Sequence, residues 1–553
     1  MIFNPQVHDN AYFDHIIIGS GISGLIAAAE ISLSHQKCLV IEQNSFPGGS
    51  INIQHQASQK HDFLYSIDNG IPLCDAKHSI FRKLGLNHVI NLVSSNYLYD
   101  VKDSNQSYKI PAGFNNAKNY LIQQFPASKR GIKRYFSRIR SLQFNTACLP
   151  IDMNYMMFSI FMLYRAADIN YPMQWKHTAK GWMDKHIKDE KLKNILNANI
   201  MFYGDNPYEV NLVYHSMRQA SYYDQSCVIQ GGSAKLIDHL VKTINNNGGQ
   251  VIYNTCVNKI LLQDENTKIP LCIGVQCCEN TTGRIFNVFL AKQAVKNKII
   301  CNCSPEVVFN ALLPIKFNQQ YQDSLVQRKF KPAKVGSSFV DIHFQVSVDL
   351  NTLFPNNLYQ TFIISNLDDK LDYENRQEDI LSRDFMFIDH SKIDSRLTSP
   401  SVTMCCLVFV SHIQEWKNMT ESQIEAQKQA ILQAYFVRLE AHYPGIQSVV
   451  SHFEIFTPDG LQARTSSSSP HGWAPQFFGA AHRAKTCCEL FQNLMFSSCW
   501  GSPGGGLTGT VINGHIAARY VLEPNAYAKR IAFFVSFVIL LVLLEILKAL
   551  GRR

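Results

Sequence analysis

The sequence FDHIIIGSGISGLIAAAEISLSHQKCLVIE (residues 13–42) carries the clearest structural signal in the chain. Its apolar start, Phe13–Ile18, predicts a short buried strand, and the alanine-rich Leu25–Ser34 predicts a helix. Lys37–Glu42 predicts a second strand that ends in an acid. Three glycines between the first strand and the helix have the spacing that permits a tight turn, close approach of the backbone to a pyrophosphate, and close packing of helix on strand. The stretch therefore predicts the strand–turn–helix–strand unit of a dinucleotide-binding fold.

The turn and the acid together point to a nucleotide cofactor. The start of the predicted helix would present N–H groups and a positive dipole to phosphate. Glu42 lies 18 residues after Gly24, where an acid would hydrogen-bond the ribose hydroxyls of adenosine. Pro47-Gly48-Gly49 lets the chain pass close to FAD, although an ordinary turn is the alternative. We predict FAD binding by Gly19, Ser20, Gly21, Ser23, Gly24, Glu42, Gly48 and Gly49.

A second glycine-rich segment precedes a predicted helix near the C-terminus. It reads WGSPGGGLTG, residues 500–509. Backbone N–H groups at such a helix entry can lie against the pyrimidine edge or ribityl chain of a flavin and stabilise charge there. The alternative is a plain helix-entry loop. We predict flavin contacts from Gly501, Pro503, Gly505, Gly506, Leu507 and Thr508.

Taken with Gly231-Gly232-Ser233, Asn254–Ile260 and Asn302-Cys303-Ser304-Pro305, these motifs resemble a known group of flavoenzymes. That group contains the phytoene desaturases, carotenoid isomerases and retinol saturases, within the amine-oxidase-like flavoprotein superfamily. The resemblance runs to about residue 523; it implies FAD and places the backbone near Val257 against the adenine. The sequence departs from the family where Asp459–Ser469 is serine-rich and where Trp473-Ala474-Pro475 replaces a Gly/Tyr pattern. Because that stretch would face the substrate, the departure leaves the substrate class open.

A chain of 553 residues exceeds one compact core, so we expect two interleaved domains. Further segments predict helices at Ala234–Asn246 and about 420–442, and strands at Gln250–Tyr253, Lys298–Cys301, Ser338–Val346 and Thr403–Val410. The expected fold class is α/β: a discontinuous Rossmann-like FAD-binding domain with an inserted mixed α+β substrate domain. The predicted FAD-binding parts are 11–100, 225–320 and 456–525, the substrate parts are 101–224 and 321–455, and 529–553 is a C-terminal hydrophobic helix acting as membrane anchor.

The C-terminal run is apolar from Ile531 to Leu544 except for Ser536, with cationic residues before and after it. A full span needs about 20 apolar residues, so three interpretations stay open: a tail anchor, a helix in the membrane interface, and a packed terminal helix. Two groups of basic residues predict either solvated surfaces or contact with anionic lipid headgroups. The first contains Lys129, Arg130, Lys133, Arg134, Arg138 and Arg140, of which Arg130, Lys133, Arg134 and Arg138 would lie near one helical face. The second contains Arg328, Lys329, Lys331 and Lys334.

Several classes of protein are disfavoured. No nucleic-acid recognition motif accompanies the basic residues, and the 15 cysteines show no paired metal-ligand spacing, so we expect neither nucleic acid nor metal as a partner. The first thirty residues lack the pattern of a secretory signal. We therefore expect a membrane-associated protein whose catalytic domain faces the cytoplasm.

The expected function is that of a membrane-associated FAD-dependent oxidoreductase, of desaturase, saturase or isomerase type, acting on a hydrophobic polyene or isoprenoid-like substrate or another lipid. Two alternatives remain: an amine-oxidase-like enzyme on a polar amine, and a non-catalytic prenyl- or lipid-carrying protein. No catalytic residue is assigned; the candidates are Asp459, Arg464 and His471, each with a structural role as the alternative. The apolar stretch Met153–Leu163 predicts core packing, with a flexible substrate lining as the alternative.

Overall fold

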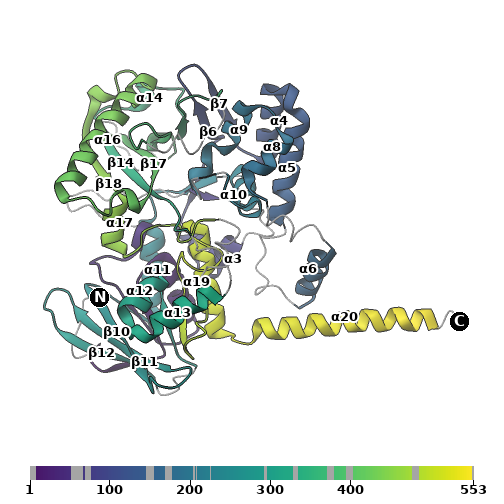
Figure 1. Cartoon of the computed structure of the whole chain (residues 1–553), viewed down its shortest axis with the longest axis vertical. Coiled ribbons are helices and arrows are strands. Elements are labelled where there is room, and N and C mark those ends of the chain that lie inside the picture. Colours follow the sequence, from purple (N-terminus) through teal and green to yellow (C-terminus); the bar gives the residue numbers. More distant parts are fainter. Residues whose placement is uncertain are drawn as a thin grey trace.

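A computed structural model of the chain describes residues 8–51, 66–68, 76–144, 155–167, 177–202, 206, 208–224, 226–291, 296–327, 334–369, 379–393, 403–475 and 485–550. The chain forms a lower nucleotide-binding part and an upper part built on a large sheet, with one long helix projecting to the side (Figure 1). Arg328, Lys329, Lys331 and Met153, noted from the sequence, lie outside the described residues.

The lower part is built on a five-stranded parallel sheet. Its order is β19 (Leu494–Phe496), β13 (Lys298–Cys301), β2 (His15–Ile18), β3 (Cys38–Ile41) and β9 (Gln250–Ile252). Every residue of β2 and β3 is buried, as expected for parallel strands covered on both faces. Three regions far apart in sequence thus share one sheet, in agreement with the predicted mixed α/β fold.

The first predicted strand is divided in the structure. Phe13 ends β1 (Ala11–Phe13) and pairs with Leu290 in a different sheet, whereas His15 begins β2. At the break, the Asp14 carboxylate accepts a hydrogen bond from the Lys37 backbone N–H at 2.8 Å. The polar Asp14 therefore marks the point where the chain passes from one sheet to the other. That second sheet contains β1, β12 (Ile285–Leu290), β11 (Leu271–Glu279) and β10 (Thr255–Gln263).

Two long helices cover the parallel sheet and pack on each other. They are α2 (Ile22–Leu33) and α19 (Gly506–Leu522), and α11 (Ala234–Asn246) also packs on α2. At Gly514 of α19, an added Cβ would contact the Ser23 carbonyl oxygen and lie 2.8 Å from Ile26 Cβ. The buried Glu30 carboxylate of α2 accepts hydrogen bonds from His515 Nδ1 at 2.6 Å and Lys83 Nζ at 2.5 Å. The absence of a side chain at position 514 and the ionic contact beside it fix α19 against α2.

The upper part centres on a seven-stranded sheet. Its order is β18 (Val450–Phe456), β14 (Ser338–Val346), β17 (Thr403–Ser411), β16 (Phe385–Asp389), β15 (Gln360–Ile363), β6 (Tyr97–Lys102) and β7 (Ser107–Pro111). Val340, Ile342 and Phe344 on one face pack with α16 (Glu421–His442). The parallel pairing of β6 with β15 joins the two predicted substrate segments, 101–224 and 321–455, in one sheet. The exact boundaries of these segments remain a prediction.

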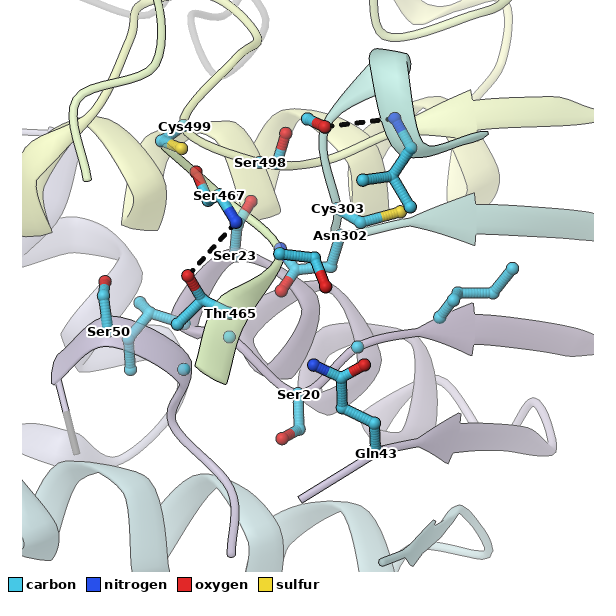
Figure 2. A pocket seen from close by; sticks show the side chains of 18 of the residues that line it. Ser20, Ser23, Gln43, Ser50, Asn302, Cys303, Thr465, Ser467, Ser498 and Cys499 are labelled. Carbon is cyan, nitrogen blue, oxygen red and sulfur yellow. Dashed lines mark hydrogen bonds between the residues drawn. The ribbon is translucent and has the colours of Figure 1, made fainter. Parts of the chain in front are cut away.

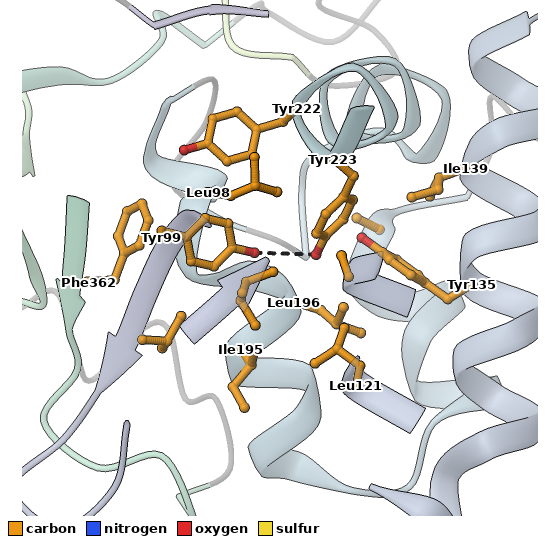
Figure 3. Packing of buried hydrophobic residues seen from close by; sticks show 14 of the residues in the cluster. Leu98, Tyr99, Leu121, Tyr135, Ile139, Ile195, Leu196, Tyr222, Tyr223 and Phe362 are labelled. Carbon is orange, nitrogen blue, oxygen red and sulfur yellow. Dashed lines mark hydrogen bonds between the residues drawn. The ribbon is translucent and has the colours of Figure 1, made fainter. Parts of the chain in front are cut away.

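Helices cover the other face of this sheet. They are α4 (Phe114–Gln124), α5 (Lys129–Phe144), α8 (Ala179–His186), α9 (Glu190–Asn197) and α10 (Leu212–Asp224). Figure 3 shows a tyrosine-rich core at this junction. In it the hydroxyls of Tyr99 and Tyr223 lie 3.3 Å apart, and the Tyr135 hydroxyl lies 3.0 Å from His215 Nε2. The tyrosines thus bury their rings and still satisfy their hydroxyl groups.

Shorter elements connect these layers. They are β4 (Ser66–Asp68), β5 (Leu92–Ser94), β8 (Ser226–Ile229), α3 (Ala76–Lys83), α12 (Pro305–Val307), α13 (Ile315–Gln327), α14 (Leu350–Leu353) and α17 (Pro458–Thr465).

The predicted C-terminal helix is present as α20 (Ala526–Leu550), which projects from the body beside α6 (Tyr155–Ala167; Figure 1). In the described part of the chain, no helix combines the length and apolar character needed to cross a membrane. The prediction of a transmembrane span at 529–553 is therefore not supported.

The prediction that Met153–Leu163 packs in a core is also wrong for most of its described side chains. Met156, Met157, Ile160 and Leu163 are exposed on α6, and only Phe158 of the described apolar side chains there is buried. The helix carries these residues away from the main cores, so their apolar character does not produce burial.

Replacing Gly514 by Ala should destabilise the protein by about 1–3 kcal/mol, because the new methyl group would force α19 away from α2. Thermal unfolding would measure the change. Gly460→Ala on α17 is the matched control, since its added Cβ would meet only Thr457 Oγ1 at 3.6 Å. Equal melting temperatures for the two variants would contradict the close packing of α19 on α2.

Candidate functional site

A cavity of about 350 Å³ opens at the carboxyl ends of β2, β3 and β13 (Figure 2). This edge of a parallel sheet is where α/β folds bind ligands, and the volume lies within the usual range for ligand sites. Ten residues predicted to bind FAD line it: Gly19, Ser20, Gly21, Ser23, Glu42, Gly48, Gly49, Val257, Gly506 and Leu507. The cavity thus brings together the three distant segments singled out in the sequence.

The turn between β2 and α2 forms one end of the cavity. Gly21 precedes α2, no side chain caps the helix, and its first turn contains no acid. The helix therefore presents its positive end to the cavity with no carboxylate in its own first turn. Gly24 does not line the cavity; an added Cβ there would lie 2.6 Å from the Gly19 carbonyl oxygen and 3.1 Å from Asn302 Cβ. Its contribution is close packing of helix on strand.

Glu42 is held rigidly at the end of β3. Its Oε2 accepts hydrogen bonds from the Ser20 backbone N–H at 2.9 Å and the Ser20 hydroxyl at 2.6 Å. Its Oε1 accepts from the backbone N–H and side-chain amide of Asn44, at 2.9 and 2.8 Å. Both oxygens are thereby fixed at the cavity wall, where a ribose could donate hydrogen bonds to them.

Gly48 and Gly49 bring a second loop against the glycine turn. The Gly48 N–H donates to the Ser20 carbonyl oxygen at 2.9 Å. Gly49 has a φ of +60°, and an added Cβ would lie 3.2 Å from Gly21 Cα. A side chain at position 49 would therefore press on the backbone that approaches the cofactor.

The segment expected near the adenine lies beside Glu42. Val257 on β10 is buried and lines the cavity together with Thr255 and Cys256. The Thr255 N–H donates to the Glu42 carbonyl oxygen at 2.9 Å, which connects β10 to the end of β3. An adenosine in this part of the cavity would meet an apolar wall on one side and an acid on the other.

Only some of the flavin contacts predicted in the C-terminal glycine-rich segment line the cavity. Gly506 and Leu507 line it, as does Thr510, whereas Gly501, Pro503, Gly505 and Thr508 do not. Gly501, Pro503 and Gly505 belong to the loop before α19, and Thr508 lies in the first turn of that helix. Arg218 Nη2 supports the loop by donating to the Gly505 carbonyl oxygen at 2.8 Å. The N-terminal end of α19 therefore points to the same cavity as that of α2.

The serine-rich segment forms the remaining wall. The predicted candidates Arg464 and His471 line the cavity, as do Ser466, Ser467 and Ser469, but Asp459 does not. The Arg464 carbonyl oxygen accepts hydrogen bonds from the side chains of Gln43 at 3.0 Å and Asn44 at 3.2 Å. This wall thus lies against the residues that follow Glu42, so part of it faces the predicted cofactor and not only a substrate.

Asn302 and Trp500 are among the lining residues that were not predicted as site residues. Asn302 follows β13, and its side-chain amide donates to the Ser497 carbonyl oxygen. The position of Asn302 after a parallel strand was the signal that could have identified it. Trp500 is buried, its Nε1 has no hydrogen-bond partner among the described residues, and its ring meets Trp473 edge-on at 5.0 Å.

Asp341 on β14 is a titratable residue whose carboxyl interacts with Arg464 of the serine-rich segment. Burial raises the pKa of the Asp341 carboxyl to about 8, and the Arg464 charge opposes the shift. Phe339 on the same face meets the His471 ring edge-on at 5.5 Å. In the described part of the chain, no three His, Cys, Asp or Glu side chains are grouped to hold a metal ion.

The residues of the cavity fit FAD. They provide a glycine turn at an uncapped helix start, a fixed acid beyond it, and a second helix start at the opposite wall. The buried Trp500 Nε1 offers a donor that a bound group could use.

Comparison with known proteins identifies the family. The model described as "Flavin containing amine oxidoreductase" matches residues 22–522. Prolycopene isomerase from Arabidopsis thaliana chloroplasts is 22% identical, covering 94% of this chain and 84% of that protein. Phytoene desaturase from Neurospora crassa is 22% identical, with 92% and 84% covered. All-trans-retinol 13,14-reductase from Danio rerio is 21% identical, with 94% and 88% covered.

A solved structure agrees at the level of the fold. Cyclohexylamine oxidase from Brevibacterium oxydans IH-35A superposes with a TM-score of 0.55 at 16% identity, covering 93% of this chain and 99% of that one. The resemblance stated from the sequence motifs is thus confirmed. Because the family model matches most of the chain and the cavity suits the cofactor, this protein belongs to the flavin-containing amine oxidoreductases and is an FAD-dependent oxidoreductase.

Proposed function

We propose that this enzyme acts on a hydrophobic polyene or isoprenoid-like substrate, as a desaturase, saturase or isomerase. The observation that carries the proposal is similarity over at least 92% of the chain to proteins named for prolycopene, phytoene and retinol chemistry. The cavity, whose glycine turn, acid and second helix start lie together, supplies the FAD site that such chemistry requires. When bound, FAD accepts a hydride from a C–H bond or donates one to a double bond.

The protein's own part in this chemistry is to bind and orient. Glu42 would accept hydrogen bonds from the adenosine ribose, and the start of α2 at Gly21–Ser23 would hold the pyrophosphate. Gly506 and Leu507, at the start of α19, would lie at the flavin end and favour negative charge there. Arg464 and His471 are placed to touch bound groups, so they remain candidates for orienting a substrate, whereas Asp459 lies outside the cavity lining.

A second candidate is oxidation of a polar amine. Trp500, which lines the cavity and meets the Trp473 ring edge-on, favours it as an aromatic surface for a cationic amine. The non-catalytic lipid carrier is not retained, because family membership shows an oxidoreductase.

We also propose that the enzyme works at a membrane with its catalytic body in the cytoplasm. The cysteines of the described chain are all free, including the exposed Cys487, which agrees with a reducing compartment. A hydrophobic substrate would be stored in such a membrane.

The two substrate classes are distinguished by anaerobic mixing of the FAD-loaded enzyme with either a carotene precursor or cyclohexylamine. Bleaching of the flavin absorption, or a changed polyene in chromatography, is expected only with the polyene. Bleaching by the amine alone would replace the polyene proposal with the second candidate.

Glu42→Gln should weaken FAD binding by about 10- to 100-fold, because it removes a charged acceptor for the ribose hydroxyls. Titration of the stripped protein with FAD, followed by fluorescence, would measure the change. Glu425→Gln, at an exposed position on α16, is the matched control. Unchanged affinity in the Glu42 variant would contradict the placement of adenosine.

Asp341→Asn should change how stability depends on pH. The folded-state pKa of about 8 lies above the usual 3.8, so unfolding releases a proton between these values. The stability given by the neutral carboxyl therefore falls as pH rises and is lost through the folded-state pKa. The variant lacks this titration. The melting temperature of the variant should therefore rise relative to that of the wild type as pH increases, up to about pH 8. A constant difference across that range would show that Asp341 does not titrate in this way.

A further inference from the structure

Two apolar helices leave the body of the protein together. α6 lies beside α20 although the two are far apart in sequence (Figure 1). The Tyr155 and Phe533 rings lie 5.3 Å apart, and Phe158 meets Phe534 edge-on at 6.4 Å. These aromatic contacts make α6 and α20 one structural element.

This element exposes an unusual set of large apolar side chains, here called the α6–α20 surface. Its members are Tyr155, Met156, Met157, Ile160, Leu163, Ile531, Phe533, Val535, Ile539 and Leu540. Ile160 is 57% exposed and Ile539 is 54% exposed. Exposed apolar side chains gathered on one element in this way mark a site of interaction.

The exposed side chains of α20 point in several directions. Between Ile531 and Leu540 none of the side chains is buried. Ile531 and Phe533 project about 200° apart around the helix axis, since each residue turns it by about 100°. The polar side chain in this run, Ser536, donates its hydroxyl hydrogen to the Ala532 carbonyl oxygen at 3.0 Å. A protein groove would cover one face of such a helix, whereas lipid can cover every exposed face.

Positive charge lies on the same side of the molecule. Lys529 and Arg530 precede the apolar run, and the Arg530 guanidinium lies 5.7 Å from the Tyr155 ring centre. Aromatic and cationic residues at the base of an apolar helix are typical of the membrane–water boundary.

The helix α5, above α6 in Figure 1, adds further cations. Among the described residues Lys133, Arg134 and Arg138 make no ion pair and together line a surface groove. In contrast, Arg140 on the same helix is paired with Asp224 through two hydrogen bonds of 2.5 and 2.6 Å. The unpaired cations are available for anionic headgroups.

We infer that the α6–α20 surface docks the enzyme on an anionic phospholipid membrane. The two helices enter the acyl-chain side of the headgroup boundary, where lipid surrounds their exposed faces, and the α5 cations lie at the headgroups. This inference rests on the proposed membrane location and names the surface that makes the contact; it does not depend on which substrate the flavin site takes.

Vesicle flotation of the full-length, FAD-loaded enzyme tests the inference. The wild type should float with vesicles of phosphatidylcholine and phosphatidylglycerol, and less with phosphatidylcholine alone. The double variant Ile160→Glu, Ile539→Glu should bind at least ~10-fold less, because two carboxylates would enter the apolar boundary.

The control is the double variant Ile285→Glu, Ile315→Glu, whose isoleucines are exposed by 61% and 85% outside this surface. It should bind vesicles as the wild type does, and all proteins should retain their flavin. Equal binding by the two double variants would overturn the inference. Loss of self-association instead of vesicle binding in the Ile160, Ile539 variant, measured by light scattering, would also overturn it and assign the surface to a second copy of the chain.

The charge contribution is tested with Lys133→Gln, Arg134→Gln, Arg138→Gln. This triple variant should lose binding to the anionic vesicles and keep the wild-type level on neutral ones. Its control neutralises the exposed Lys242, Lys259 and Lys417 with glutamine. Equal loss in both triple variants would show a dependence on net charge alone and would contradict a role for the α5 cations.

Discussion

The packing of α2 against the strands on one side and α19 on the other is the constraint on which the cofactor site depends. Gly24 lets α2 approach Asn302 and the end of β2, and Gly514 lets α19 approach the first turn of α2. Both helices consequently begin at one cavity, at the carboxyl edge of the parallel sheet. An added methyl group at either glycine would therefore displace a helix whose start lines the cofactor cavity.

A second consequence of this packing is that the polar groups at the helix junction are satisfied inside the protein. Glu30 of α2 is hydrogen-bonded by His515 of α19 and paired with Lys83 of α3. A buried carboxylate is costly unless it is paired, so this contact also specifies which helices meet. The cofactor site is therefore stabilised by residues that never touch the cofactor.

Much of the secondary structure in both parts of the protein could be predicted from local sequence. The expected helix at Ala234–Asn246 and strands at Lys298–Cys301 and Ser338–Val346 have the bounds seen in α11, β13 and β14. Their apolar periodicity is local, so it does not require knowledge of the partner strands. The break at Asp14 was not predictable, because it depends on Phe13 pairing with Leu290 from a distant hairpin. For the same reason the apolar pattern of Met153–Leu163 could not reveal that its side chains are exposed: hydrophobicity indicates what a side chain avoids, not whether the fold covers it. The assignment of individual site residues, including Asn302 and Trp500, required the fold to bring separate strand ends to one cavity.

The order of strands in the parallel sheet has a consequence for how the enzyme matures. β2, near the start of the chain, pairs with β13, and β13 pairs in turn with β19 at residues 494–496. Such contacts between distant residues give a high contact order. A high contact order slows folding, because the entropy of closing long loops is lost before strand pairing can stabilise the chain. β19 and α19 leave the ribosome long after β2 and β3. The flavin can therefore be captured at its full binding strength only once these late elements have been made, and the earlier strands must avoid aggregation until then.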